Sequence, residues 1–255
     1  HRLVDEGFKE IVLLGQTVNS YQAGKHDFGD LLVALNRVEG LRRIRFTSPH
    51  PSDASEPMIE AMANCNKVCQ QIHLPLQSGS TRVLRAMRRT YTADEYRDLV
   101  ARMRDRMPNL AISTDIIVGF CGETEENFQQ TYSMMAEIRY DSAFMFKYSD
   151  REGTLAHKSL TDDVPEKVKI ERLQRIIEQQ YQISHQINQT LIGKTVEVLV
   201  EGESKRSTND FFGRTRSFKT TVFPRPNANV GDIVPVQINS ATAKTLIGNV
   251  VSPGN

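Results

Sequence analysis

Small and polar residues gather at five points between residues 15 and 154, each directly after a short apolar run. The five segments read GQTVNSY, TSPHPSD, LQSGS, GFCGETEE and YSDREGT. Glycine and serine let a ligand approach the backbone, and glutamine, asparagine and aspartate offer hydrogen-bond partners to an amino acid or a ribose. If the apolar runs are parallel strands, these loops meet at one edge and form a small-molecule site. Loops of this composition also occur where nothing binds, so composition alone leaves the function open.

Asp115 is the acidic residue whose orientation can be predicted most directly. In the run AISTDIIVGF, the apolar residues Ile112, Ile116 and Val118 alternate with Ser113 and Asp115. Successive side chains of a strand point to opposite faces of the sheet. The alternation therefore predicts that the apolar residues face the helices and that Asp115 points inward, towards the site.

Two other chemistries are open to residues on these runs. His73 and His50 could join Asp115 as metal ligands, and Lys147 could form a Schiff base. The sequence has no H-x-H pair and no clustered carboxylates, and a hydrogen-bonded core histidine explains either imidazole. We therefore expect no metal site and leave the catalytic residues unassigned.

The three cysteines, Cys65, Cys69 and Cys121, are too few for a disulfide framework. An odd number of cysteines suits a reducing compartment, which predicts a cytoplasmic protein. Cys65 and Cys69 form only a C-x-x-x-C pair, and Cys121 stands alone. We expect all three to pack in the interior.

Amphipathic segments separate the apolar runs EIVLLG, RRIRFTS, VCQQIHLPLQ, NLAISTDIIVGF and SAFMFKYS. This alternation is typical of parallel strands joined by helices, so the fold class is α/β. Thr92 with Glu95 and Asp53 with Glu56 have the spacing of helix N-terminal caps. A long helix is predicted over residues 164–190, whose helical spacing brings together Val168, Leu173, Ile176, Ile177, Ile183 and Ile187.

The pattern changes to alternation of period two after Gly193. Five short strands in about 60 residues are typical of a small closed barrel of the oligonucleotide-binding type. We place the domain boundary at residue 190, with an α/β domain at 1–190 and an all-β domain at 191–255. The net charge of +1 is unevenly spread, because residues 191–255 hold eight Lys or Arg against five Asp or Glu.

Basic and aromatic residues are interleaved in the second domain. Cations pair with phosphates and aromatic rings stack on bases, which favours RNA as the ligand. The residues predicted to contact RNA are Lys205, Arg206, Arg214, Arg216 and Lys219. Ordinary solubilising charge is the alternative interpretation.

Hydrophobic residues make up 39% of the chain and charged residues 25%, and no apolar run approaches the roughly 20 residues of a membrane helix. We expect a soluble protein that does not enter membranes. The first residues, HRLVDEGF, resemble the end of an amphipathic helix and contain no initiator Met. This predicts that the natural protein extends upstream.

The motifs LGQTVNSY, RFTSPHPSD, HLPLQSGS and STDIIVGFCGET resemble, in order and spacing, those of the MiaB-type tRNA methylthiotransferases. The tail, from VLVEGESKRS to FFGRTRSFKTTVFP, is similar to their TRAM domain. The resemblance implies part of a radical S-adenosylmethionine (SAM) (β/α) barrel followed by a TRAM barrel, which is OB-like. Cys121 and Glu152 stand where the family usually has proline, and Thr17 stands where it has asparagine.

The resemblance implies a radical enzyme that methylthiolates N6-isopentenyladenosine beside the anticodon. SAM and two [4Fe–4S] clusters are the implied cofactors. A tRNA anticodon stem-loop and a reductant such as flavodoxin or ferredoxin are the implied partners. The cluster ligands of the family, including a CxxxCxxC loop, are absent from this sequence, so the chain alone is expected to be inactive.

The resemblance also implies which residues bind SAM, at the ends of the predicted strands: Gln16, Asn19, Gln77, Ser78, Asp115, Gly119 and Glu123. Turn or capping roles are the alternative, above all for Ser78 and Glu123. Phe146 and Tyr148 could flank an adenine or belong to the core. For the whole protein, the alternatives are a ribosomal protein or another tRNA adenosine as substrate, or a non-catalytic RNA-binding module.

Overall fold

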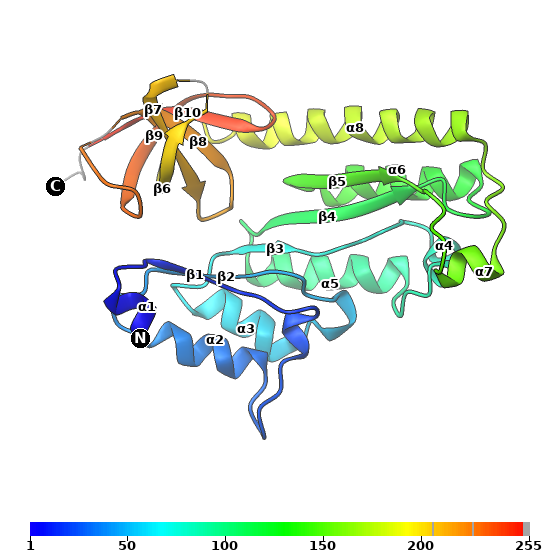
Figure 1. Cartoon of the computed structure of the whole chain (residues 1–255), viewed down its shortest axis with the longest axis horizontal. Helices are drawn as coiled ribbons and strands as arrows, with labels where there is room; N and C mark the ends of the chain where they lie inside the picture. Colours follow the sequence, from blue (N-terminus) through cyan, green and yellow to red (C-terminus); the bar gives the residue numbers. More distant parts are fainter. Residues whose placement is uncertain (206, 226, 252–255) are drawn as a thin grey trace.

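The computed structural model describes residues 1–205, 207–225 and 227–251. A curved, open α/β sheet occupies the first part of the chain, and a small closed β-barrel lies beside one end of it (Figure 1). The long helix α8 runs along the sheet and leads into the small barrel. Both predicted architectures are confirmed.

Five parallel strands form the open sheet. β1 pairs with β2, an isolated bridge from Ile44 to Val68 leads on towards β3, and β3, β4 and β5 form a continuous parallel ladder. The strands are β1 (Glu10–Leu13), β2 (Arg43–Phe46), β3 (Gln71–His73), β4 (Ala111–Val118) and β5 (Ser142–Lys147). Each lies within one of the five predicted runs.

Helices follow the strands and cover the convex face of the sheet. The helices are α1 (Arg2–Asp5), α2 (Phe28–Asn36), α3 (Glu56–Asn64), α4 (Thr81–Ala86), α5 (Ala93–Arg106), α6 (Glu125–Ile138), α7 (Leu155–Ser159) and α8 (Glu166–Gln189), with short 3₁₀ helices η1 (Val18–Ser20) and η2 (Pro51–Asp53). The Thr92 and Glu95 capping box is confirmed at α5. The predicted Asp53 cap is wrong, because Ser55 caps α3 through the Met58 amide while Asp53 ends η2.

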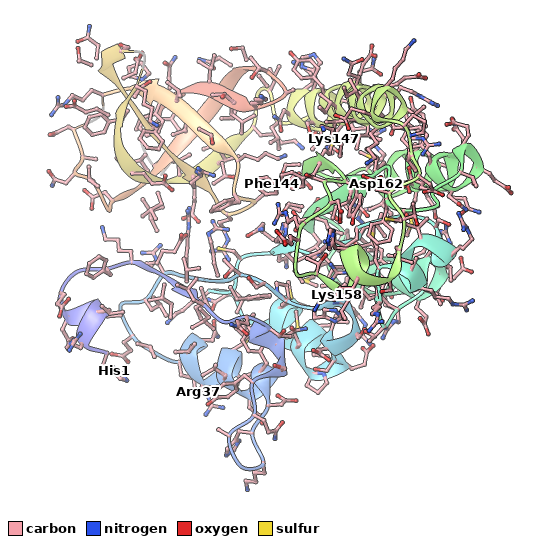
Figure 2. All side chains as sticks on the ribbon, turned by 45° about the vertical axis from the view of Figure 1, so that its right-hand side comes forward. His1, Arg37, Phe144, Lys147, Lys158 and Asp162 are labelled. Atoms are coloured by element: carbon pink, nitrogen blue, oxygen red, sulfur yellow. The ribbon has the colours of Figure 1, made fainter. Side chains whose placement is uncertain are left out.

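Burial along β4 and β5 shows which face meets the helices. Ile112, Ile116 and Val118 are fully buried, whereas Asp115 is only half-buried, as the alternation predicted. On β5, Lys147 pairs with Glu166 of α8, so its side of the strand faces that helix. Phe144, labelled with Lys147 in Figure 2, belongs to the opposite, concave face and is 59% exposed. The concave face of this half-barrel is therefore accessible.

Helix α8 packs on β5 through one stripe of its surface. Ile176 and Ile183 are buried in it, whereas Ile177, which was predicted to join them, is 45% exposed. At its end, the Asn188 amide donates to the carbonyls of Thr242 and Ala243 in the small barrel. The helix thus contacts both domains.

The small barrel closes in the strand order β10, β8, β7, β6, β9. Its strands are β6 (Thr195–Ser204), β7 (Ser207–Thr215), β8 (Thr220–Pro224), β9 (Ile233–Ala241) and β10 (Thr245–Val250). Val198, Phe211, Phe223 and Leu246 are among the side chains that fill its core. Two of the tail's aromatic rings are therefore used for packing.

Within residues 1–205, 207–225 and 227–251, none of the helices has the length and apolar composition that crossing a bilayer requires.

Candidate functional site

Four side chains from three neighbouring strands meet on the concave face of the sheet. Strand register sets His73 beside Ser113 and Asp115 beside Phe144. His73 Nε2 lies 3.3 Å from an Asp115 carboxylate oxygen, and its Nδ1 lies 3.0 Å from the Ser113 hydroxyl. The Phe144 ring contacts the imidazole edge to face at 5.8 Å. An acid, a base and an exposed ring thus share one accessible patch, which suits hydrogen bonding and stacking with a nucleoside.

The loops after β1 and β2 are joined through Asn19. Its side-chain amide donates to the His50 carbonyl at 2.9 Å and accepts from the His50 amide at 2.8 Å. Asn19 is buried, so its polar groups hold one loop to the other and do not face a ligand. Gln16, three residues earlier, is exposed at the same end of the sheet.

Gln77 and Ser78 take part in the packing of the sheet. Gln77 has a left-handed φ of +68° and its backbone pairs with β4, donating to the Asp115 carbonyl and accepting from the Ile117 amide. Ser78 is fully buried with its hydroxyl 3.2 Å from that of Thr131 on α6. The structure gives Ser78 a turn role and leaves no part of its side chain for a ligand.

Glu123 folds back under the loop after β4. One carboxylate oxygen accepts the Gly119 amide at 2.9 Å, and the same oxygen accepts from Arg172 of α8 at 2.9 Å. Burial raises the pKa of Glu123, while the Gly119 amide and the Arg172 guanidinium act to lower it. Gly119 has φ +73°, and an added Cβ would lie 2.4 Å from Lys169 Cγ. These two positions hold the loop against α8.

Of the seven residues predicted to bind SAM, the structure thus brings Asp115 to the concave face and leaves Gln16 exposed nearby. The side chains of Asn19, Ser78 and Glu123 form contacts within the protein instead. Strand alternation had already set Ser113 on the face of Asp115 and His73 opposite the buried Ile72, but neither residue was predicted to bind SAM.

The three cysteines do not form a cluster site. Cys65 and Cys69 precede β3 at one end of the sheet, whereas Cys121 follows β4 at the other. All three are buried, and burial raises the pKa of each thiol, so the metal-binding thiolate is disfavoured. Across the part of the chain that the structure describes, no three His, Cys, Asp or Glu side chains are grouped to hold a metal ion. These residues do not fit a [4Fe–4S] cluster, which needs several thiolates in one place.

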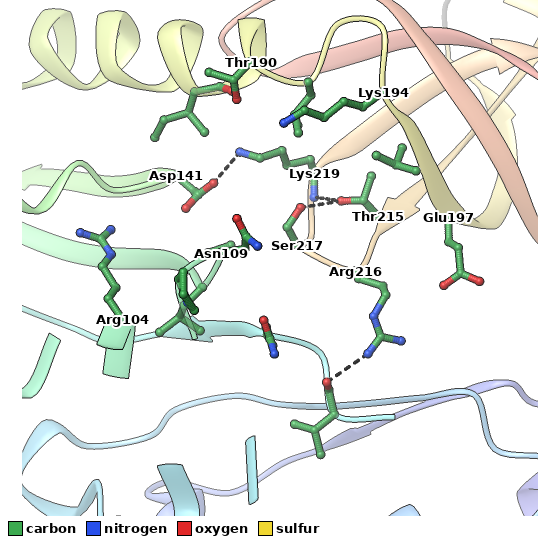
Figure 3. A pocket seen from close by; sticks show the side chains of 18 of the residues that line it. Arg104, Asn109, Asp141, Thr190, Lys194, Glu197, Thr215, Arg216, Ser217 and Lys219 are labelled. Carbon is green, nitrogen blue, oxygen red and sulfur yellow. Dashed lines mark hydrogen bonds and ion pairs between the residues drawn. The ribbon is translucent and has the colours of Figure 1, made fainter. Parts of the chain in front are cut away.

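The basic residues predicted to contact RNA divide into two groups. Lys205 is exposed on the turn after β6, and Arg206 lies outside the described residues. Arg214, Arg216 and Lys219 instead face the open sheet. Arg214 lies 3.6 Å from Glu201, Arg216 donates to the carbonyls of Asn66 and Val68, and Lys219 lies 2.6 Å from Asp141 (Figure 3).

In the structure, Arg216 and Lys219 both make contacts between the two domains, and their predicted contact with RNA stays a prediction. Lys219 and Asp141 are only 10% and 16% exposed, and both partners of Arg216 are backbone carbonyls of the other domain. Both side chains thus help to join the two domains.

A cavity of about 880 Å³ lies between the domains, lined by Arg104, Asp141, Lys194 and Lys219 among others (Figure 3). It adjoins the residues that precede β4 and β5, at the amino ends of these strands. Ligands of parallel α/β sheets bind at the carboxyl ends. The cavity is thus separate from the Asp115 patch.

Comparison with known proteins gives two family matches. The radical SAM superfamily matches residues 1–135, and the TRAM domain matches residues 189–251. The fold of the chain is similar to that of coproporphyrinogen III oxidase from Escherichia coli, a radical SAM enzyme, with a TM-score of 0.55 over 91% of this chain and 54% of that one. At 14% sequence identity, this likeness supports the fold alone.

Curated relatives align over almost the whole chain. The tRNA-2-methylthio-N(6)-dimethylallyladenosine synthase of Acetivibrio thermocellus is 49% identical over 96% of this chain and 52% of its own length. The enzyme of the same name from Alkaliphilus oremlandii is 49% identical over 98% of this chain and 53% of its own. The chain therefore spans about half the length of the curated relatives it matches.

Proposed function

The chain belongs to the radical SAM superfamily and carries a TRAM domain, and from this premise we propose that the whole protein is a tRNA methylthiotransferase. Its proposed substrate is N6-isopentenyladenosine next to the anticodon, within a tRNA anticodon stem-loop. The observation that carries the proposal is the 49% identity to enzymes of this name across both domains together. A barrel and an RNA-binding module matched in one alignment favour a tRNA substrate over a ribosomal protein.

The proposed cofactors are SAM and two [4Fe–4S] clusters, which in this superfamily supply the radical chemistry. The concave face fits SAM through its donor set, because Asp115 and His73 offer polar atoms beside the exposed Phe144 ring. We propose that Asp115 and Gln16 bind the polar groups of SAM, with the backbone of Gln77 and Gly119 shaping the loops beside them. The ligands of both clusters would come from the part of the protein outside this chain.

A reductant such as flavodoxin or ferredoxin and a cytoplasmic location complete the proposal. An adenosine in an anticodon loop has to leave its stack to reach a recessed site. The exposed Phe144 and Phe146 rings would then serve as its stacking surface.

A non-catalytic RNA-binding module is the second candidate, favoured by the separation of the three cysteines at opposite ends of the sheet. Reductive cleavage of SAM distinguishes the two. The full-length protein, reconstituted with iron and sulfide without oxygen and supplied with SAM and a chemical reductant, is expected to release 5′-deoxyadenosine. Residues 1–255 under the same conditions are expected to release none. A full-length protein that holds its clusters and yet leaves SAM intact would favour the binding module.

A further inference from the structure

We infer that Arg43 and Arg45 are positioning residues that lock the TRAM barrel to the amino ends of the sheet strands. We call this pair the arginine clamp. The inference rests on the proposed function only where it concerns turnover, because the locking itself is a property of this chain. Its consequence is that RNA bound to the TRAM barrel meets the concave face at a fixed distance and angle.

The clamp consists of four hydrogen bonds from one strand to the backbone of the other domain. Arg43 donates to the carbonyls of Glu197 and Arg214, both at 2.9 Å. Arg45 donates to the carbonyls of Thr215 at 2.7 Å and Arg216 at 3.0 Å. The side chains of Arg43 and Arg45 are 0% and 3% exposed. Every acceptor lies on β6, on β7 or at the end of β7.

Guanidinium chemistry explains why this arrangement sets an orientation. The group is planar and presents its donors in a fixed fork, so two hydrogen bonds from one side chain define a direction as well as a distance. Arg43 and Arg45, two residues apart on β2, each donate two such hydrogen bonds to adjacent parts of the TRAM barrel, on β6, on β7 or at the end of β7. A lysine at either position would supply the charge without the fixed directions.

The interface between the two domains contains several charged side chains, although apolar side chains alone could exclude water from it. Glu10 on β1 approaches Arg45 Nε at 3.1 Å and Arg43 at 3.9 Å, so two buried cations share one carboxylate. Buried cations are costly unless hydrogen-bonded, and apolar side chains pack at lower cost. Compared with apolar side chains, the two arginines add hydrogen bonds of fixed direction to the four carbonyls.

The turn that the clamp grips is itself held in an unusual shape. Phe218 lies between β7 and β8 with φ +64°, a conformation that a residue with a bulky side chain rarely adopts. Its ring lies 5.0 Å from the Arg45 guanidinium and 4.5 Å from that of Arg214. Such a backbone persists where its surroundings fix it, and here the clamp and the ring stacking do so.

Contacts around the clamp fasten the same interface at its edges. Lys219 pairs with Asp141, which directly precedes β5. Asp232 pairs with Lys9, which directly precedes β1. Arg216 reaches the carbonyls of Asn66 and Val68 between them (Figure 3). The TRAM barrel is thus tied to segments at the amino ends of β1, β3 and β5, with β2 gripped by the clamp.

The first test measures domain orientation in residues 1–255, using residual dipolar couplings and ¹⁵N relaxation. We expect the two domains of the parent chain to tumble as one body. Arg43→Met with Arg45→Met should let them reorient while each retains its own spectrum. Arg225→Met is the matched control, because Arg225 is an exposed TRAM arginine paired with Glu203 inside the same domain. Arg43→Lys with Arg45→Lys, which keeps both buried charges without the fixed donor directions, takes the place of the double variant if that fails to fold.

The second test uses the full-length enzyme and separates kcat from KM for tRNA. A displaced catalytic geometry costs up to about a hundredfold in rate, so we expect the clamp variants to lose roughly tenfold to hundredfold in kcat. The KM for tRNA should change less than about threefold, since the RNA-binding surface itself is intact. Arg225→Met should leave kcat unchanged.

The two tests distinguish a failure of the clamp from a failure of the proposed function. Unchanged domain orientation in the clamp variants, whether methionine or lysine replaces the two arginines, would overturn the locking role. Reoriented domains with an unchanged kcat would overturn the positioning role. A parent enzyme without activity on tRNA would remove the proposed function, and the orientation measurement on this chain would still decide on the clamp.

Discussion

The Asp115 carboxylate lies 3.3 Å from His73 Nε2 on the accessible face of the sheet, although both residues sit on strands whose other faces are fully buried. Strand alternation is what brings them there. Position on the strand, and not the residue type alone, makes this carboxylate a candidate ligand group. Its role can be tested without altering the fold.

Asp115→Ala in the full-length protein should weaken SAM binding and leave tRNA binding nearly unchanged. Loss of one hydrogen bond to a charged group corresponds to roughly tenfold to hundredfold in Kd. Calorimetric titration with each ligand measures this, and Asp98→Ala on the exposed face of α5 is the control. Equal SAM affinity in variant and parent would remove Asp115 from the binding site.

The raised pKa of Glu123 predicts how the stability of the fold changes with pH. Burial raises its pKa above the ordinary 4.5, so the folded protein holds this proton more tightly than the unfolded chain does. Its contribution to stability is full below pH 4.5 and is lost as the pH rises through the raised pKa. Glu123→Gln cannot ionise and should therefore gain stability relative to the parent as the pH rises above 4.5. Urea unfolding across this range gives the trend, and the reverse trend would mean that the Arg172 ion pair outweighs burial.

Lys205 is the one predicted RNA contact that the described residues leave both exposed and away from the domain interface. Lys205→Ala in the full-length protein should weaken tRNA binding and flatten the plot of log affinity against log salt by about 1 unit. Lys158→Ala on α7, an exposed lysine of the other domain, is the control. A slope identical to that of the parent would show that Lys205 meets no phosphate.

At the scale of the secondary-structure elements, the loop after β4 depends on Gly119. An added Cβ would meet Lys169 Cγ at 2.4 Å, and φ is +73°. Gly119→Ala should cost roughly 1–3 kcal/mol from backbone strain and more from the clash with α8. Gly153→Ala is the control, because its φ of +86° brings similar strain while nothing lies within 4 Å of the new Cβ. Thermal melts of both variants measure the difference, and equal losses would mean that the loop yields to the added methyl group.

Elements with a strong period could be predicted from the sequence, because periodicity is a local property. The five sheet strands and α8 were found in this way, and the Asp115 orientation followed from them. The start of α3 was misplaced because Asp53 and Ser55 are both good caps, and only the fold decides between them. Ile177 was wrongly predicted to be buried, because the apolar stripe of α8 is wider than the part of the helix that β5 covers.

The site was less predictable than the fold, because its contacts join residues far apart in the sequence. The pairing of Lys219 with Asp141 and that of Glu123 with Arg172 of α8 could not be predicted, because the two partners are far apart in the sequence. Charge spacing within one segment carries no information about such partners. Only the packing of α8 and of the TRAM barrel on the sheet does.

At the scale of the whole molecule, the candidate cofactor site and the TRAM barrel lie at different places on the sheet. The concave face with Asp115, His73 and Phe144 lies on the open side of the sheet, and the TRAM barrel is fixed at the amino ends of its strands. The arrangement suits a substrate that is held by one domain and modified at the other. The proposed tRNA substrate extends well beyond the nucleotide to be modified, and it could therefore contact both surfaces.

Nucleoside analysis of tRNA shows whether the full-length protein methylthiolates N6-isopentenyladenosine. The full-length protein, with reconstituted clusters, SAM and a reductant, is incubated with tRNA that carries N6-isopentenyladenosine, and the digested nucleosides are separated and weighed by mass spectrometry. We expect N6-isopentenyladenosine to disappear as its 2-methylthio derivative forms. Unmodified tRNA from a protein that holds both clusters and cleaves SAM would contradict it.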